Sequence, residues 1–290
     1  MTNQPKEKYQ TVTLADKDYP ALLREIPNPP ETLSLLGNFR AWNKPAVAIV
    51  GTRKATSYGL QAARALGREL ASSGITVVSG LALGIDAEAH RGALEANGNT
   101  VAVLGSGINM IYPATNRPLA EKIIKQGGAI ISEFSPDLPP ERWTFPQRNR
   151  IIAGLSNVTL VVEAPEKSGA LITAYLALEY NREVAALPGE ITSLNSQGTN
   201  KLIKLGAAII RNADDVLELL GITTPNAKAP LDKLDKIENV IMQCLSSPQS
   251  KDEILNLTQL PADTLNQKLS LLELKGAIKN NGGIYEISNS

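Results

Sequence analysis

The sequence predicts an α/β protein, with a doubly wound, mostly parallel sheet followed by a small C-terminal domain. From Ala46 onward, short runs of β-branched residues alternate with segments of helical period. The runs are apolar throughout, as in strands that helices cover on both faces. Crossovers of this kind are right-handed, so we expect a Rossmann-like arrangement.

The expected elements follow one another in the order strand, helix, strand. The predicted strands are residues 47–50, 76–78, 100–104, 129–132, 158–163, 183–187 and 207–210. The predicted helices are residues 60–73, 86–96, 118–126, a segment around 150–155, 170–180, 200–205 and 213–220, with Asp86 as an N-cap.

The regions around this sheet differ in composition. Residues 1–45 contain two proline clusters and too few apolar residues for a core, so we expect an N-terminal extension packed on the domain 46–221. Residues 222–230 have the composition of a linker.

Residues 231–290 then read as helices over 233–245, 250–257 and 261–275, and a hairpin of 277–279 with 284–287. Ser250 and Glu253 form a capping-box pattern, while Pro261 and Gly276 bracket the third helix. Three helices followed by a hairpin is the order of a winged-helix-like domain.

The overall composition excludes several classes of protein. Lys+Arg and Asp+Glu both total 29, so a polyanion could bind only at a local cluster of cations. Aromatic residues make up 4%, which argues against an extended stacking platform. The single cysteine, Cys244, lies in an apolar helical stretch and reads as a core thiol. The polar N-terminus and the lack of a long apolar run predict a cytoplasmic protein.

The residues that follow the predicted strands predict an anion site. Ligands of open α/β sheets bind at the carboxyl ends of the strands, where glycine turns and helix N-termini offer free amides. Cations near these turns could instead be surface residues paired with Glu133, Glu163 or Glu166. The expected site residues are Gly51, Arg53, Lys54, Arg148, Asn149, Arg150, Lys167, Ser168 and Gly169.

The same segments do not support catalysis. Gly105-Ser106-Gly107 lacks the third glycine of a dinucleotide fingerprint, and no Gly-Lys-Ser/Thr closes a phosphate-binding loop. His90 is the sole histidine, and we expect it to be a hydrogen-bonded structural residue. We therefore expect no catalytic residue, no metal and no cofactor.

The motifs taken together resemble the DprA/Smf DNA-processing family. The resemblance runs in order from about Tyr19 to Gly221, and its motifs lie at residues 51–59, 79–86, 103–107, 145–153, 168–173, 188–189 and 198–200. Such proteins bind single-stranded DNA through a basic pocket, form dimers and load the RecA recombinase during natural transformation.

The resemblance also implies roles for single residues. Arg53 and Lys167 match pocket cations, and residues 148–150 match the FPxRNR segment. Asp86 and His90 match family positions to which we assign a structural and not a catalytic role. Thr52 stands where the family usually has serine, which keeps the hydroxyl group.

Two other functions remain open. A nucleotide or phosphoribosyl hydrolase could use a similar scaffold, but Glu190 follows Pro188-Gly189 where a second glycine would be required. A winged-helix regulator with a metabolite-sensing domain would need a basic third helix.

The C-terminal domain has the wrong charge for such a regulator. It lacks arginine and contains fewer cations than acids. We therefore expect it to contact protein rather than duplex DNA. The cations are Lys233, Lys236, Lys251, Lys268, Lys275 and Lys279, and the acids are Asp232, Asp235, Glu238, Asp252, Glu253, Asp263, Glu273 and Glu286.

We also expect a homodimer to which helix 213–220 contributes. Val216, Leu217, Leu219 and Leu220 offer more apolar surface than one stripe facing a core requires.

Overall fold

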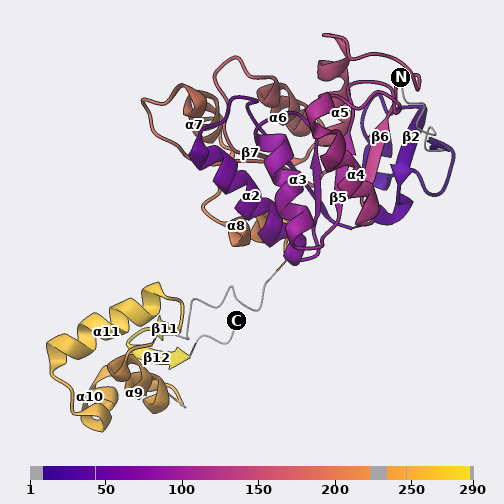
Figure 1. The fold of residues 1–290 in the computed structure, drawn as a ribbon. Coiled ribbons are helices and arrows are strands. Elements are labelled where there is room, and N and C mark those ends of the chain that lie inside the picture. The colour runs from indigo at the N-terminus through magenta and orange to yellow at the C-terminus, as the bar shows by residue number, and fades with distance from the viewer. Residues whose placement is uncertain (1–8, 43, 223–233, 246, 288–290) are drawn as a thin grey trace. The chain divides into compact units, whose positions relative to one another are not determined.

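A computed structural model describes residues 9–42, 44–222, 234–245 and 247–287 (Figure 1). The chain divides into two compact units, a larger one that ends at Ile222 and a smaller one that follows. Beyond Ile222, the predicted linker 222–230 lies outside the described residues. Among the described helices, none is long and apolar enough to cross a membrane.

The larger unit is built on one nine-stranded sheet with the order β1-β2-β6-β5-β4-β3-β7-β8-β9. From β6 to β9, every neighbouring pair in this order is parallel. The chain moves outward from β3 to β6 and then returns to β7 on the other side of β3. The doubly wound sheet predicted from the sequence is therefore confirmed. Its parallel strands are β3 (Ala46–Val50), β4 (Thr76–Ser79), β5 (Thr100–Val103), β6 (Ala129–Ser132), β7 (Val158–Val161), β8 (Glu183–Ala186) and β9 (Ala208–Ile209).

The N-terminal segment extends this sheet. β2 (Thr32–Gly37) pairs antiparallel with β6, and β1 (Gln10–Thr13) pairs antiparallel with β2. Neither strand was predicted, because each carries polar residues among its apolar ones. Between and after them lie α1 (Ala21–Arg24) and the 3-10 turn η1 (Phe39–Trp42), and Tyr19, Leu23 and Trp42 are buried in the main core.

Helices cover both faces of the sheet (Figure 1). Along β3, Val47 and Ile49 face one core cluster, while Ala48 and Val50 face the other. Period-two alternation between two buried faces explains why this strand is apolar at every position. The helices are α2 (Ser57–Ser72), α3 (Ile85–Glu95), α4 (Arg117–Lys125), α5 (Thr144–Gly154), α6 (Gly169–Glu179), α7 (Gln197–Lys204) and α8 (Ala213–Leu219), with 3-10 turns η2 (Ala114–Asn116) and η3 (Leu194–Ser196).

Two helices begin earlier than their sequences suggested. α2 begins at Ser57 because the Thr56 side chain caps it by accepting a hydrogen bond from the Gly59 amide. α5 begins at Thr144, six residues before the predicted helix, and contains Pro146 in its first turn. Proline is tolerated there, since the first amides of a helix have no intrahelical acceptor. Residues 145–149 are therefore helical and not a loop.

The apolar residues of α8 are used inside the unit. Val216 and Leu217 are buried in the core beside α2, and Leu219 and Leu220 pack against the same cluster. α8 therefore has less spare apolar surface than its sequence suggested.

The smaller unit has the predicted winged-helix order. Ser250 and Glu253 form the predicted capping box, and Gly276 ends the third helix with a φ of +66°. Cys244 lies partly buried in the first helix. The elements are α9 (Lys236–Cys244), β10 (Gln249–Ser250), α10 (Lys251–Thr258), α11 (Ala262–Leu274), β11 (Ile278–Asn281) and β12 (Ile284–Ile287), with the strand order β10-β12-β11.

Candidate functional site

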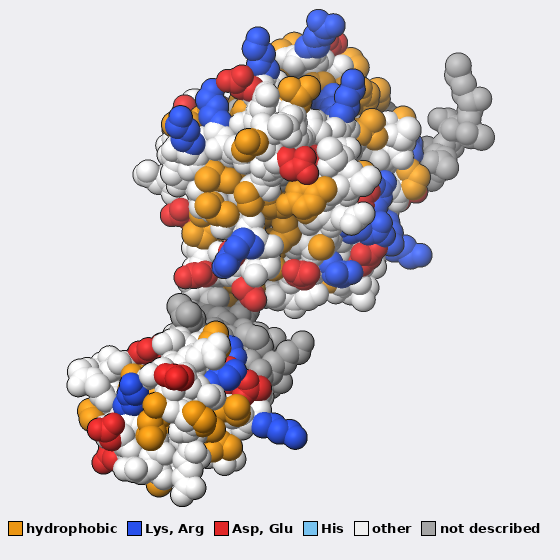
Figure 2. All heavy atoms as spheres, turned by 90° about the vertical axis from the view of Figure 1, so that its left-hand side faces the viewer, with side chains coloured by type: hydrophobic (Ala, Val, Ile, Leu, Met, Phe, Trp, Pro, Cys, Tyr) orange, Lys and Arg blue, Asp and Glu red, His pale blue; other side chains and the backbone are white. Residues whose placement is uncertain are grey.

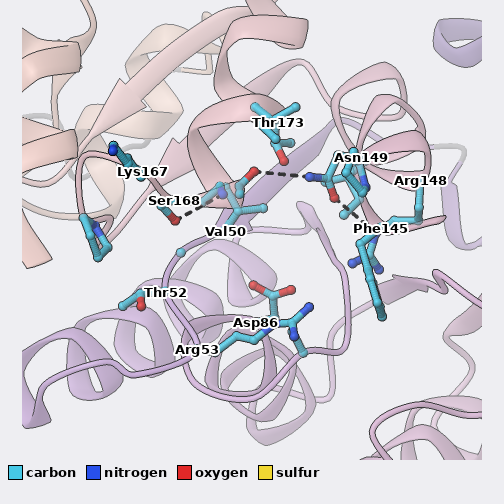
Figure 3. A pocket seen from close by; sticks show the side chains of 18 of the residues that line it. Val50, Thr52, Arg53, Asp86, Phe145, Arg148, Asn149, Lys167, Ser168 and Thr173 are labelled. Carbon is cyan, nitrogen blue, oxygen red and sulfur yellow. Dashed lines mark hydrogen bonds between the residues drawn. The ribbon is translucent and has the colours of Figure 1, made fainter. Parts of the chain in front are cut away.

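A pocket of about 400 Å³ lies where the strand order reverses, between the carboxyl ends of β3 and β7 (Figure 3). Open α/β sheets bind ligands at this position, because the loops on either side turn away from each other. We call it the basic pocket. Among its lining residues are Gly51, Thr52, Arg53, Lys54, Asp86, Phe145, Arg148, Asn149, Lys167, Ser168, Gly169 and Thr173.

The loop after β3 brings two exposed cations to the pocket. A side chain at Gly51 would place its Cβ 2.5 Å from the Ile85 side chain and 2.8 Å from the Glu163 carbonyl oxygen, so this turn requires glycine. Arg53 and Lys54 follow, and within the described chain neither forms an ion pair. The Arg53 guanidinium lies 5.0 Å from the centre of the Phe145 ring, which orients it at the pocket wall.

Arg148 is a buried cation beneath the pocket, 4% exposed. Its Nη1 donates hydrogen bonds to the carbonyl oxygens of Gly80, at 2.8 Å, and Val103. Burial lowers the pKa of Arg148 to about 10, with Asp86 opposing that shift. The guanidinium therefore remains charged at neutral pH. It adds positive potential to the pocket floor but is not free to move toward a ligand.

Asp86 is buried close to this arginine and does not cap α3. The N-cap is Gly84, with a φ of +79°, and Asp86 is the second residue of the helix. Its carboxylate accepts a hydrogen bond of 3.1 Å from the Gly80 amide. Burial raises the pKa of Asp86, while Arg148 acts in the opposite direction.

The start of α6 forms the opposite wall of the pocket. Ser168 caps this helix, and its hydroxyl accepts a hydrogen bond of 3.2 Å from the Ala170 amide. Asn149 donates to the Gly169 carbonyl oxygen at 3.2 Å, which ties α5 to the first turn of α6 (Figure 3). Lys167 is exposed and forms no ion pair with any described residue. A helix N-terminus beside a free lysine favours a phosphate group.

The predicted site residues therefore meet in one pocket, apart from Arg150. Its side chain pairs with Glu133 and donates to the Asn28 carbonyl oxygen at 2.8 Å. Residues two apart on a helix point about 200° apart. Arg148 and Arg150 therefore leave α5 in opposite directions, whereas a loop could have brought both to the pocket.

The sequence reasoning missed an aromatic group at the pocket edge. Phe145 lies 5.8 Å from Tyr112, between ring centres, and Tyr112 is 43% exposed. Both rings line a smaller hollow that shares Arg53 and Arg148 with the basic pocket. The low aromatic content of the chain does not show that its few rings gather in one place. The Phe145-Pro146 of the 145–150 motif was the one signal in the sequence for an aromatic ring at this site.

His90 takes no part in this site. Its ring is buried and its Nδ1 lies 2.7 Å from the Thr100 hydroxyl, which confirms the predicted hydrogen-bonded histidine. Among the described residues, no three His, Cys, Asp or Glu side chains are grouped so as to hold a metal ion.

In the smaller unit, Lys268 of α11 and Lys275, which follows its last residue, are paired within the unit. Lys268 contacts Asp235 and Glu238, and Lys275 lies 2.8 Å from Glu238, which is 2% exposed. Both cations are therefore turned toward α9, where acids neutralise them.

Both units match sequence profiles of known protein families. The sequence profile of the DNA recombination-mediator protein A family matches residues 10–221, and that of the DprA winged helix domain matches residues 225–283. Protein Smf of Synechocystis is 38% identical over 315 residues, covering 95% of this chain and 79% of the relative.

Two solved structures show the same relationship. The X-ray structure of DprA from Streptococcus pneumoniae matches with a TM-score of 0.69 and 38% identity, over 73% of this chain and 75% of that one. DprA from Helicobacter pylori matches with a TM-score of 0.66 and 34% identity, over 74% of this chain and 97% of that one, and its structure concerns that protein's single-stranded DNA binding mode.

Proposed function

Because this chain belongs to the DNA recombination-mediator protein A family, we propose that it binds single-stranded DNA through the basic pocket. One observation carries the proposal. Arg53, Lys54 and Lys167 come from the ends of two different strands and border one pocket, and none of them has an ion-pair partner in the described chain. Cations in a structural salt-bridge network would have partners.

The strand is bound mainly through its phosphates. Arg53 and Lys54 contact the backbone from the β3 side, and Lys167 contacts it from the first turn of α6. Arg148 acts through its charge and holds the floor in place. Bases contact Phe145 and Tyr112, since every base has a face that stacks on aromatic rings.

The pocket is a binding site and not a catalytic one. Asp86 borders the pocket but is only 6% exposed, and we assign its carboxylate a structural role because it accepts a hydrogen bond from the Gly80 amide. His90 is enclosed in the core. No observation favours the nucleotide or phosphoribosyl hydrolase, and we propose no enzymatic activity.

In the cell, this binding serves DNA recombination in the cytoplasm. We infer that the protein protects incoming single strands and loads the RecA recombinase on them during natural transformation. The family supports this part of the proposal.

A homodimer would extend the strand-binding surface. Since α8 is used in the core, we place the contact on the face formed by α7, its preceding loop and the edge strand β9. Figure 2, turned toward the α7 side, shows hydrophobic side chains gathered on one face of the larger unit. Ile191, Leu194, Leu205 and Ile209 are 91%, 70%, 66% and 53% exposed.

The experiment that tests strand binding compares single-stranded and duplex oligonucleotides of equal length at two salt concentrations. We expect the single strand to bind more tightly and its affinity to fall as salt rises, because phosphate contacts release counterions. Equal binding of both forms would overturn the proposal.

A further inference from the structure

The segment that lines the basic pocket after β3 continues into a second pocket at the start of α2. Beyond Lys54, the residues Thr56, Ser57 and Tyr58 border a cavity of about 660 Å³. We call this the acidic pocket. Its other lining residues are Glu163, Pro188, Gly189, Glu190, Ser193 and Ser196, at the end of β7 and after β8.

This pocket has the opposite electrostatic character to the basic pocket. Its described lining contains two carboxylates and no lysine or arginine. The buried Glu163 carboxylate accepts a hydrogen bond of 2.9 Å from the Thr56 amide and another from the Thr56 hydroxyl, at the N-terminus of α2. A phosphate would meet a carboxylate there, so the acidic pocket does not take the DNA backbone.

Two glycines give the polar side chains room. A Cβ at Gly59 would lie 2.4 Å from the Glu163 carboxylate, and one at Gly189 would lie 2.1 Å from the Ser196 hydroxyl oxygen. Ser196 is 6% exposed, and its hydroxyl has no hydrogen-bond partner in the part of the chain that the structure describes. Such a group next to a cavity is available to a ligand.

The pocket also offers an aromatic face. Tyr58 is 55% exposed, and its hydroxyl lies 3.5 Å from the Pro188 carbonyl oxygen. A flat ligand can stack on this ring while its N–H groups donate to the carboxylate and hydroxyl oxygens. Adenine, cytosine and guanine carry an exocyclic amino group that donates two hydrogen bonds, and thymine does not.

We propose that the acidic pocket receives an amino-bearing nucleobase from the strand whose phosphates lie in the basic pocket. This inference rests on the proposed function and adds a base preference to it. Because one continuous segment, the loop after β3 and the first turn of α2, lines both pockets, a strand held at Arg53 can present a neighbouring base near Tyr58. Glu190, which is exposed, accepts hydrogen bonds from the amino group.

The test titrates the full chain with oligo-dC and oligo-dT of equal length, followed by fluorescence anisotropy. We expect oligo-dC to bind about tenfold more tightly, the effect of one hydrogen bond to a charged group. Glu190→Gln should reduce this ratio at least threefold by removing the charge. Glu69→Gln, an exposed carboxylate far along α2, makes the same charge change outside the pocket and should preserve the ratio.

Two further measurements separate the possible failures. Tyr58→Ala should weaken binding of both oligonucleotides, because either base loses its stacking partner. Equal affinities, or a ratio unchanged by Glu190→Gln while oligo-dT still binds, would overturn the base site and leave the proposed function standing. If the unmodified chain binds no single-stranded DNA, both the base site and the proposed function are wrong. A last measurement titrates the Arg53→Glu variant with free deoxycytidine. If deoxycytidine binds this variant as tightly as oligo-dC binds the unmodified chain, the base does not depend on the strand to reach the acidic pocket, and that part of the proposal is wrong.

Discussion

Arg148 and Asp86 bind the same peptide residue from two sides: the arginine donates to the Gly80 carbonyl oxygen and the aspartate accepts from the Gly80 amide. The Gly80 loop follows β4, so the pair connects the carboxyl ends of the sheet from α5 and α3. A Cβ at Gly80 would lie 2.6 Å from the Arg148 guanidinium, so glycine is needed for this approach. The floor of the basic pocket depends on these three residues.

Replacing Arg148 should therefore lower the free energy of unfolding, because its side chain bonds to buried groups. Arg148→Met leaves the buried Gly80 and Val103 carbonyl oxygens without a charged donor and removes the positive charge that acts on Asp86, a loss of about 3–5 kcal/mol in the free energy of unfolding. Lys125→Met, at the exposed end of α4, should change that energy by roughly 0.5 kcal/mol or less. Urea unfolding of the two variants measures the difference, and equal stabilities would contradict a structural role for Arg148.

His90 should make the larger unit sensitive to acid. Thr100 donates its own hydroxyl proton to the Val77 carbonyl oxygen, so Nδ1 of His90 must be the donor to Thr100. Burial lowers the pKa of His90 from 6.5 to about 3. The unfolded chain then binds a proton that the folded chain excludes, so stability is full above pH 6.5 and falls as the pH drops toward 3.

Removing this titration should flatten the acid side of the stability profile. His90→Asn keeps a donor for Thr100 but has no proton to gain, and comparison with the unmodified chain isolates the histidine. We expect the difference in unfolding free energy between the two to change by on the order of 4 kcal/mol between neutral pH and pH 3. Parallel profiles would show that His90 is solvated.

The sheet was predictable because its strands are buried on both faces and therefore apolar at each position, as Val47 to Val50 are. β1 was not predicted because it is an edge strand with three of its four residues exposed, and β2 was not predicted because the buried Ser34 interrupts its apolar residues. Only the second half of α5 was predicted, because Pro146 is typical of a helix end, although in the first turn proline carries little penalty.

The basic pocket was predictable from chain topology, since Gly51, Arg53 and Lys167 follow strands that meet at one edge. Whether a cation is free or paired depends on neighbours remote in sequence. Arg150 and Glu133 illustrate this, and so does the burial of Arg148. The acidic pocket was not predictable for the same reason, since it joins residues 56–58 to residues 188–196.

The oligomeric state should depend on the α7 face. Leu205→Glu places a charge among exposed apolar side chains that would be buried in a homodimer, and it should produce monomers without unfolding the protein. Leu257→Glu, an exposed position on α10, is the matched control. Light scattering at micromolar concentration distinguishes these states, and a monomeric unmodified chain would count against the dimer.

The C-terminal unit should not contribute duplex binding. Lys268 and Lys275 are neutralised by Asp235 and Glu238, so α11 presents little positive charge to a major groove. A chain that ends after Gly221 should retain single-strand affinity, and the isolated unit should show no measurable duplex binding at physiological salt. Loss of most DNA affinity on truncation, with oligomerisation intact, would mean that this unit binds DNA.

The most direct test of the central claim is the affinity of the double variant Arg53→Glu/Lys167→Glu for single-stranded DNA. Both residues lie at the basic pocket without ion-pair partners in the described chain. Reversing their charge should therefore repel phosphate without destabilising the fold. We expect affinity to fall by at least about a hundredfold, and the salt dependence to weaken by roughly 0.7 in log–log slope for each phosphate that the variant no longer neutralises. Lys125→Glu, which makes one such charge reversal on the exposed end of α4, should bind as the unmodified chain does. Normal affinity in a folded double variant would contradict the assignment of strand binding to this pocket.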